Sequence, residues 1–282
     1  MPSRGGAAVV RFLDRLPWPL GEECFAVGLT AKALVDPTRR SNALAWASKH
    51  ADGELAQWRL ALDTMRTLGR FMAINCLIGA ERPNTLRRHL VIHGRTHLDA
   101  AIGRGPVLLL GFHLGPPGAF LALRLLGYRL TFIGAADAVR FWPRRRGWTG
   151  LLEDRDTIPL TPGDAVSAAR ALHVGHRVLQ QGGTVFILGD GGLGPEVFRV
   201  SVPGKEVVMR SGWFTMRRLS GATTLPVLCH LHGRQRVLEV FPPLPAPVRD
   251  IGADREMCGT HLMPIVSAYV RARPAQCLSL AD

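Results

Sequence analysis

The sequence predicts an α/β protein with a central, mostly parallel sheet flanked by helices and with a helical N-terminal region. Residues 101–245 alternate short apolar runs with amphipathic helical patterns, which is typical of parallel strands joined by helices. Residues 1–100 instead place apolar side chains at helical spacing, as in 55–62 and 71–78. The length of 282 residues and the 47% hydrophobic content suit a large buried core.

The core elements follow one another in a regular order. Strands are expected at 106–112, 129–134, 184–189, 224–231 and 236–241, and helices at 117–126, 162–181, 211–220 and 254–272. Thr161-Pro-Gly-Asp164 has the spacing of a helix start with proline at the first helical position, and Gly182-Gly183 ends that helix. We therefore divide the chain into a helical N-terminal region, 1–100, packed on an α/β core, 101–282, that closes with a helix.

The charge balance indicates anionic partners. The chain holds 35 Lys and Arg against 22 Asp and Glu, a formal net charge of +13, which favours phosphate groups, acidic lipid headgroups, an acidic carrier protein or nucleic acid. The five cysteines contain no C-x-x-C pair, so we expect neither a disulfide framework nor a zinc site, and a reducing cytosol is the simplest compartment. No signal peptide or membrane-spanning run is apparent, so membrane contact is expected from one face.

His113 is the candidate catalytic residue. The expected strand 106–112 delivers it to the carboxyl edge of the sheet, where open α/β sheets bind ligands. Pro116-Pro117 then opens a helix, and the glycine-rich turn with Gly115 and Gly118 offers backbone N–H groups for an anionic headgroup or an oxyanion. The alternative is a structural histidine, satisfied within the core.

Three stretches of the chain carry a resemblance to a known family. They are 94–115, with an apolar strand leading to His113; 179–190, with a helix ending in glycine, an apolar strand and Asp190; and 202–228, with the turn Gly204-Lys205 and a small-residue approach to the next strand. In order and spacing this resembles the lipid A biosynthesis acyltransferases and the related lysophospholipid acyltransferases. The resemblance covers roughly 65–245.

The resemblance implies an activity and its partners. It implies transfer of a fatty acyl group from a thioester of acyl-carrier protein or CoA to a membrane lipid or glycolipid, with His113 as general base and no cofactor. The family carries an Asp or Glu five residues after the histidine to orient the imidazole, whereas this chain has Gly118. Such an orienting carboxylate matters, because its loss in the Ser-His-Asp template lowers kcat by about 10⁴.

Three explanations can account for Gly118. A carboxylate elsewhere takes over the role, with Asp190 at the end of a neighbouring expected strand as first candidate and Asp137 and Glu196 behind it. Alternatively, His113 works without an acid on an easier acceptor, such as an amine or an acidic hydroxyl. In the third explanation the protein is a lipid-binding or partner subunit that keeps the fold without the reaction.

Basic residues near the expected site are candidates for substrate binding. The run 189–194 fits G-x-G-x-x-G, but the residues after it look extended rather than helical, so we expect a flexible loop and not a dinucleotide site. Under the resemblance, this loop, together with Gly204 and three basic side chains, holds a phosphate-bearing donor or acceptor; the alternative is an exposed basic turn. The basic side chains are Arg199, Lys205 and Arg210.

The segment 140–148 interleaves arginines, including Arg144 and Arg145, with two tryptophans. Arginine pairs with phosphate and tryptophan prefers the membrane interface, so we expect this segment to contact an anionic bilayer or an acidic carrier protein. A solvated loop is the plainer alternative, and no nucleic-acid motif accompanies the cluster. We expect a peripheral protein on the cytoplasmic face of the bacterial inner membrane, without nucleic acid as a partner.

Two histidine patterns are candidate metal sites. His89, His93 and His97 recur every four residues, and His230 and His232 share one side of an expected strand. Gly94 interrupts the first pattern as a helix face, and neither pattern carries acidic ligand spacing. We therefore expect no metal.

Overall fold

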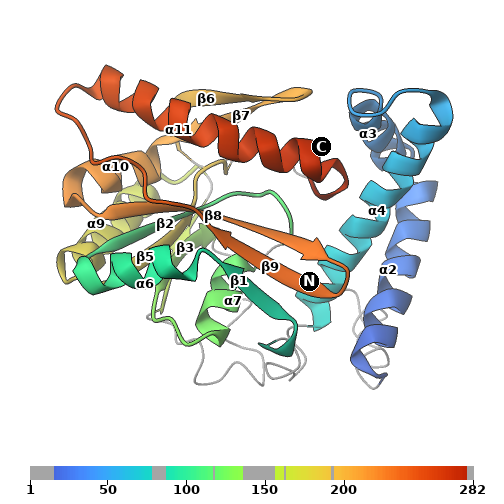
Figure 1. Ribbon diagram of the computed structural model, residues 1–282, viewed down its shortest axis with the longest axis horizontal. Coiled ribbons are helices and arrows are strands. Elements are labelled where there is room, and N and C mark those ends of the chain that lie inside the picture. The colour runs from blue at the N-terminus through green and yellow to red at the C-terminus, as the bar shows by residue number, and fades with distance from the viewer. Residues whose placement is uncertain are drawn as a thin grey trace.

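The computed structural model describes residues 16–77, 87–116, 118–135, 156–161, 163–191 and 194–277. Within these ranges helices cover both faces of a central sheet, and an N-terminal group of helices stands at one edge (Figure 1). The strands are β1 (Leu90–His93), β2 (Val107–Gly111), β3 (Thr131–Ala135), β4 (Thr157–Leu160), β5 (Thr184–Leu188), β6 (Glu196–Val202), β7 (Lys205–Arg210), β8 (Thr223–His232) and β9 (Gln235–Val240). The helices are α2 (Trp18–Val35), α3 (Pro37–Ala47), α4 (Glu54–Leu77), α6 (Arg95–Arg104), α7 (Ala119–Leu125), α9 (Ala165–Gln180), α10 (Ser211–Ser220), α11 (Ile251–Ala272) and the short 3₁₀ turn η2 (Pro274–Gln276).

The central sheet has seven strands in the order β1-β9-β8-β2-β5-β3-β4. All neighbours pair in parallel except β8 and β9, which form an antiparallel pair. β6 and β7 form a separate antiparallel hairpin outside this sheet. The predicted fold class, a mostly parallel sheet with flanking helices and a helical N-terminal region, is therefore confirmed.

Several local features differ from the sequence expectation. β4, β6 and β7 are not among the expected strands, although residues 195–202 look extended in the sequence. β1 lies within 1–100, where only helix was expected, and it pairs in parallel with β9. A run of three apolar residues is too short for periodicity to separate strand from helix, and the pairing with β9 decides it. Helix α9 begins at Ala165 rather than 162, because the Asp164 carboxylate, and not Thr161, accepts the backbone N–H groups of Val166 and Ser167 as the N-cap.

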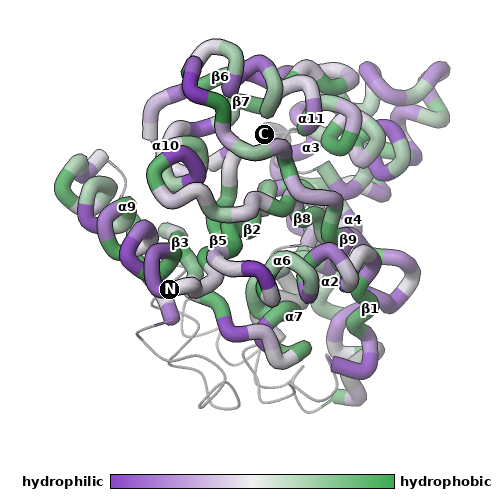
Figure 2. The backbone as a smooth tube through the Cα atoms, turned by 60° about the vertical axis from the view of Figure 1, so that its left-hand side comes forward, coloured by the Kyte–Doolittle hydropathy of each residue, from purple (hydrophilic) through white to green (hydrophobic). Residues whose placement is uncertain are grey.

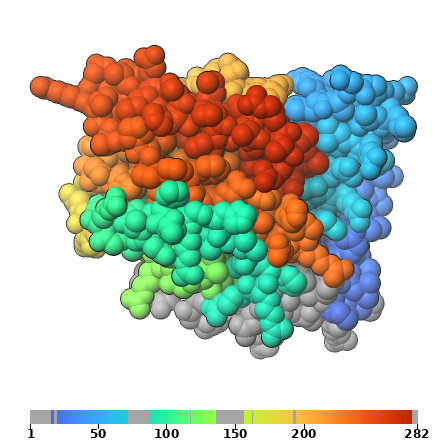
Figure 3. Space-filling model, in the orientation of Figure 1, coloured from blue at the N-terminus to red at the C-terminus, as the bar shows by residue number. Residues whose placement is uncertain are grey.

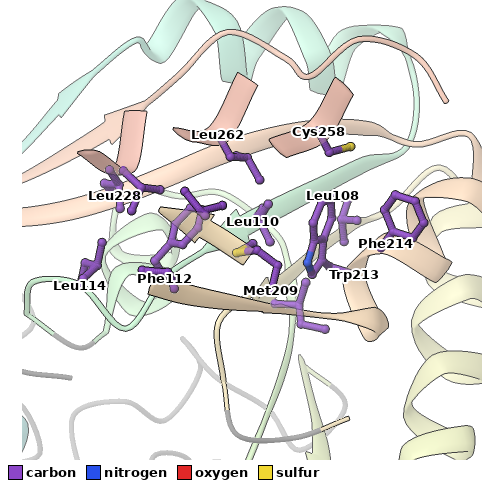
Figure 4. Packing of buried hydrophobic residues seen from close by; sticks show 14 of the residues in the cluster. Leu108, Leu110, Phe112, Leu114, Met209, Trp213, Phe214, Leu228, Cys258 and Leu262 are labelled. Atoms are coloured by element: carbon purple, nitrogen blue, oxygen red, sulfur yellow. The ribbon is translucent and has the colours of Figure 1, made fainter. Parts of the chain in front are cut away.

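Alternate residues of β2 serve opposite faces of the sheet. Val107 and Leu109 pack with α6 and α7, whereas Leu108 and Leu110 pack with α9, α10 and α11. Figure 4 shows Leu110 below Leu262 of α11 in this second layer. Because both faces are covered, β2 carries no polar side chain, and apolar residues predominate in β5 and in the middle of β8 (Figure 2).

The N-terminal helices are attached to the core through α3 and α4. Trp46 of α3 donates its indole N–H to the carbonyl of Pro274 at 2.9 Å, and α4 packs against η2. Just beyond α3, Lys49 Nζ donates to the carbonyl of Gly204 at 3.1 Å, at the tip of the β6–β7 hairpin. Figure 3 shows these helices pressed against the C-terminal end of α11. None of the helices in the described ranges combines the length and apolarity needed to cross a bilayer.

Candidate active site

His113 and Asp190 occupy equivalent positions after two neighbouring parallel strands. Gly111, the last residue of β2, is in register with Leu188, the last residue of β5, and the Gly189 amide continues the ladder by donating to the Gly111 carbonyl at 2.9 Å. Each candidate residue comes two positions after this last register pair. Parallel pairing thus brings two residues 77 positions apart in the chain to the same point of the sheet's carboxyl edge.

The Asp190 carboxylate contacts His113 through both the backbone and the ring. The His113 amide donates to both carboxylate oxygens at 2.9 Å, and His113 Nδ1 lies 2.9 Å from Asp190 Oδ1. The Asp190 side chain is 5% exposed and the His113 side chain 45% exposed. The buried carboxylate therefore fixes the imidazole from behind, while a large part of the ring stays accessible.

This contact also sets the electrostatics of the imidazole. The hydrogen bond from the Asp190 carboxylate, together with its negative charge, raises the pKa of His113 above its usual range, although partial burial opposes the shift. A carboxylate at Nδ1 selects the tautomer with the proton on Nδ1 and the basic lone pair on Nε2. An imidazole held in this way can accept a proton at Nε2.

Gly118, which stands where the family carries an acid, begins a helix. It is the N-cap of α7 and has φ of +94°, in the left-handed region that favours glycine. The carboxylate that contacts His113 comes from the residue that follows the end of β5 by two positions, and not from the residue five positions after the histidine. Of the other candidates, Asp137 lies outside the described residues, and Glu196 pairs with Arg199 at 2.8 Å on the β6–β7 hairpin.

An apolar cavity of about 490 Å³ opens beside His113. It lies between the ends of β3, β4 and β5 and the helices α9 and α10, and its volume falls within the roughly 300–1,000 Å³ of small-molecule sites. Apolar and glycine residues make up most of its lining, and His113 and Arg210 are the ionisable side chains that the described residues contribute to it. The apolar lining includes Ala135, Leu160, Ala168, Ala171, Leu172 and Leu188.

The sequence reasoning missed this apolar lining, although part of the signal was present. Ala168, Ala171 and Leu172 recur at the three- and four-residue spacing of one helix face on α9. Such a small-residue face is equally typical of close helix packing, and only the position of α9 against the sheet leaves a cavity in front of it.

Arg210 is the predicted substrate-binding residue that lines this cavity. It ends β7, and its guanidinium donates to loop carbonyls, from Nε to Gly191 at 2.8 Å and from Nη1 to Gly194 at 3.4 Å. The loop approaches His113 closely, since a Cβ added at Gly191 would lie 3.3 Å from Cε1 of the imidazole.

Five other predicted binding residues lie away from the cavity lining, and one of them, Gly118, is the N-cap of α7. Gly115 packs against β8 and α11, where a side chain would overlap the Cys229 carbonyl and the Tyr269 hydroxyl. Gly204 and Lys205 form the hairpin tip beside α3, and Arg199 is engaged by Glu196 and Glu206 on the hairpin surface. The sequence places Arg199, Gly204 and Lys205 close to the loop 189–194, but the β6–β7 hairpin carries these three residues away from it. Arg144 and Arg145 lie outside the described residues.

The histidine patterns do not assemble a metal site in the part of the chain that is described. No group of three or more His, Cys, Asp or Glu side chains there is arranged to hold a metal ion. His230 is buried and lies 3.4 Å from Glu239, while its partner in the sequence pattern, His232, is exposed. Burial and the neighbouring Arg273 lower the pKa of His230 to about 4.

Comparison with known proteins gives a distant structural likeness. No protein-family model and no curated protein sequence matches the chain. Among solved structures it is similar to the 1-acyl-sn-glycerophosphate (LPA) acyltransferase PlsC from Thermotoga maritima, with a TM-score of 0.43 and 14% sequence identity. The likeness covers 83% of this chain and 98% of that chain. At this level of similarity the comparison establishes no family for the protein.

Proposed function

We propose that the protein is an acyltransferase that moves a fatty acyl group from an acyl-carrier-protein or acyl-CoA thioester to a lipid, glycolipid or related small-molecule acceptor. The observation that carries the proposal is the His113–Asp190 contact of 2.9 Å beside an apolar cavity. A basic imidazole backed by a buried carboxylate is the arrangement that deprotonates a weakly acidic hydroxyl.

The geometry supports a single-displacement reaction. His113 Nε2 removes the acceptor proton as the oxygen attacks the thioester carbonyl, so a carbon–oxygen bond forms. Collapse of the tetrahedral intermediate breaks the carbon–sulfur bond, and the imidazolium returns its proton to the departing thiolate. Asp190 stabilises the imidazolium between these steps, and general-base assistance of this kind contributes about 10²–10⁴ in rate.

The apolar cavity supplies the place for the acyl chain. Its lining from β3, β4, β5 and α9 is almost free of ionisable groups, so an alkyl chain gains burial there without leaving a charge unpaired. His113 is part of the same lining, so the thioester carbonyl would be held beside the imidazole. An apolar pocket with a base in its wall favours a substrate with a long hydrocarbon chain joined to a reactive carbonyl.

The resemblance noted in the sequence points to the same activity and to its setting. We propose a peripheral position on the cytoplasmic face of the bacterial inner membrane, because the acceptor is a lipid and the net charge of +13 favours an anionic surface. The same charge suits an acidic carrier protein or the phosphates of CoA as donor, and the mechanism needs neither a cofactor nor a metal.

Of the three explanations of Gly118, we propose the relocated acid. A carboxylate is in hydrogen-bond contact with His113, so a mechanism without an acid is unnecessary. A lipid-binding or partner subunit without the reaction would not require a buried acid that binds both the ring and the backbone amide of an accessible histidine. The non-catalytic alternative becomes an outcome of the following test.

The test measures acyl transfer by the purified full-length protein. Labelled acyl-carrier-protein and acyl-CoA thioesters are supplied with a bacterial lipid extract, and acylated products are identified by mass spectrometry. His113→Ala is expected to abolish transfer, whereas His232→Ala, at an exposed histidine outside the cavity, should leave it intact. Turnover that survives His113→Ala would refute the mechanism, and lipid binding without turnover from any donor would favour the non-catalytic subunit.

A further inference from the structure

Asp190 lies in a glycine-rich run of the sequence. Residues 189 to 194 are Gly-Asp-Gly-Gly-Leu-Gly, and glycine loses more conformational freedom on folding than any other residue. Gly189 and Gly191, on either side of Asp190, therefore do not by themselves fix the backbone that carries the carboxylate. The His113 amide donates to the carboxylate itself, and the carbonyls of the flanking glycines are bound by another residue.

One residue, Arg210, meets the loop at three carbonyls. Its backbone amide donates to the Gly189 carbonyl at 2.8 Å, its Nε to the Gly191 carbonyl at 2.8 Å and its Nη1 to the Gly194 carbonyl at 3.4 Å. These carbonyls bracket Asp190 on both sides. The planar guanidinium suits this task because its donors have fixed directions, whereas a lysine ammonium binds from a single point.

Arg210 is itself held in place by secondary structure. It is the last residue of β7 and the N-cap of α10, and the following Ser211 amide donates to the Pro195 carbonyl at 2.9 Å. The clamp is thus fixed to a strand and a helix, while the loop that it grips contains four glycines. The Arg210 side chain therefore links the loop carbonyls to two ordered elements, the hairpin and α10.

We propose that Arg210 is a positioning residue that clamps the glycine loop and so holds the Asp190 carboxylate against the His113 imidazole. The inference rests on the proposed function, because the pair that it concerns is the proposed base and its acid. It assigns Arg210 an action through Asp190, in place of the phosphate contact that the sequence suggested.

A positioning role and a purely electrostatic role predict opposite effects on the His113 pKa. If the clamp is lost, the Asp190 carboxylate moves away and the His113 pKa falls, with or without a charge at position 210. If Arg210 acts by its charge alone, removing a nearby cation raises the His113 pKa, and lysine in its place leaves the pKa unchanged. The comparison therefore needs one variant that keeps the charge and one that removes it.

The test is an NMR titration of the full-length protein with ¹³C-labelled histidine rings, in which His113→Gln identifies the signal. Arg210→Lys and Arg210→Met are expected to lower the His113 pKa by roughly half to one pH unit, part of the 1–3 units that a close opposite charge contributes. Arg170→Met, at an exposed arginine on α9, is the matched control and should leave the pKa unchanged.

Kinetics supply the second measurement. Both Arg210 variants should lower kcat by about 10- to 100-fold, the scale of a misplacement near 1 Å, with little change in the donor KM. An unchanged or raised His113 pKa in both variants would overturn the clamp, and so would a raised donor KM with normal kcat. If the wild type shows no acyl transfer, the titration still tests the positioning role of Arg210. The acyltransferase proposal and the positioning proposal can therefore be refuted independently.

Discussion

At the scale of single residues, the decisive feature is the origin of the carboxylate beside His113. A carboxylate at position 118 would have to reach back from the N-cap of α7, at a residue whose φ of +94° favours glycine. Asp190 instead arrives from the adjacent strand end, and it binds the His113 amide as well as the ring. Through these two contacts the carboxylate is held relative to both the backbone and the ring of His113.

Removing the Asp190 charge tests this assignment. Asp190→Asn keeps the size of the side chain but loses the anion that stabilises the imidazolium, so kcat for acyl transfer should fall by about 10²–10⁴, as in other histidine–carboxylate pairs. Adding Gly118→Asp to this variant should not restore the rate, because the backbone at 118 aims no side chain at the ring. Recovery of activity in the double variant, measured in the same thioester assay, would contradict a relocated acid.

The pH dependence of the reaction has a definite sign. A general base must be neutral, and the Asp190 hydrogen bond raises the His113 pKa, so kcat/KM should rise with pH through a midpoint above the usual histidine value of 6.5. Asp190→Asn removes this bond, and the midpoint should move to lower pH while the plateau falls. A profile of kcat/KM against pH for both proteins checks this. An unchanged midpoint in Asp190→Asn would show that Asp190 does not set the His113 pKa.

At the scale of elements, α9 shapes the cavity. Its face with Ala168, Ala171 and Leu172 lies opposite the ends of β3 and β5, and the small side chains at 168 and 171 leave room for a chain. The register of this helix is set by Asp164 as N-cap, so the cap indirectly fixes which residues face the cavity.

Filling the cavity from α9 should change the accepted chain length. Ala168→Phe places a ring in the lining, and overpacking of this kind costs about 1–3 kcal/mol, so kcat/KM for the longest donors should fall roughly tenfold or more. Short-chain donors should be affected far less. Ala169→Phe, at the exposed neighbour on the same helix, is the control. An equal loss for all chain lengths would show that the cavity does not hold the chain.

At the scale of the whole molecule, a buried contact at Trp46 joins the N-terminal helices to the core. Trp46 is 3% exposed, belongs to the same buried cluster as β2 and α11, and donates to the Pro274 carbonyl. Nearby, His50 contacts the Pro203 carbonyl of the hairpin at 3.1 Å. The N-terminal region therefore packs on both the C-terminal turn and the hairpin whose other end carries Arg210.

This packing predicts one cooperative unfolding transition that depends on Trp46. Trp46→Ala should lower the free energy of unfolding by about 3–5 kcal/mol, the usual cost of removing a large buried aromatic side chain. Trp46→Phe keeps an aromatic ring and loses the hydrogen bond, so most of the stability should remain. Urea unfolding followed by circular dichroism measures both, and an unchanged midpoint for Trp46→Ala would show that the N-terminal region does not stabilise the core.

The sequence by itself determined the features that depend on local pattern. Apolar alternation and glycine or proline punctuation located the strands that became β2 and β5, and with them the strand ends that hold His113 and Asp190. These signals succeed because a segment buried on both faces must be apolar throughout, whichever strands lie beside it. The same signals could rank Asp190 first among three carboxylates but could not choose it.

Only the tertiary structure decided which strand ends meet. The order that sets β2 beside β5, and the register of Gly111 with Leu188, place Asp190 at 2.9 Å from His113. The hairpin likewise carries Gly204 and Lys205 to α3 while leaving Arg210 at the loop. Strand order and register depend on how all the helices cover the sheet at once, so no local run of residues encodes them and the site exists only in the folded chain.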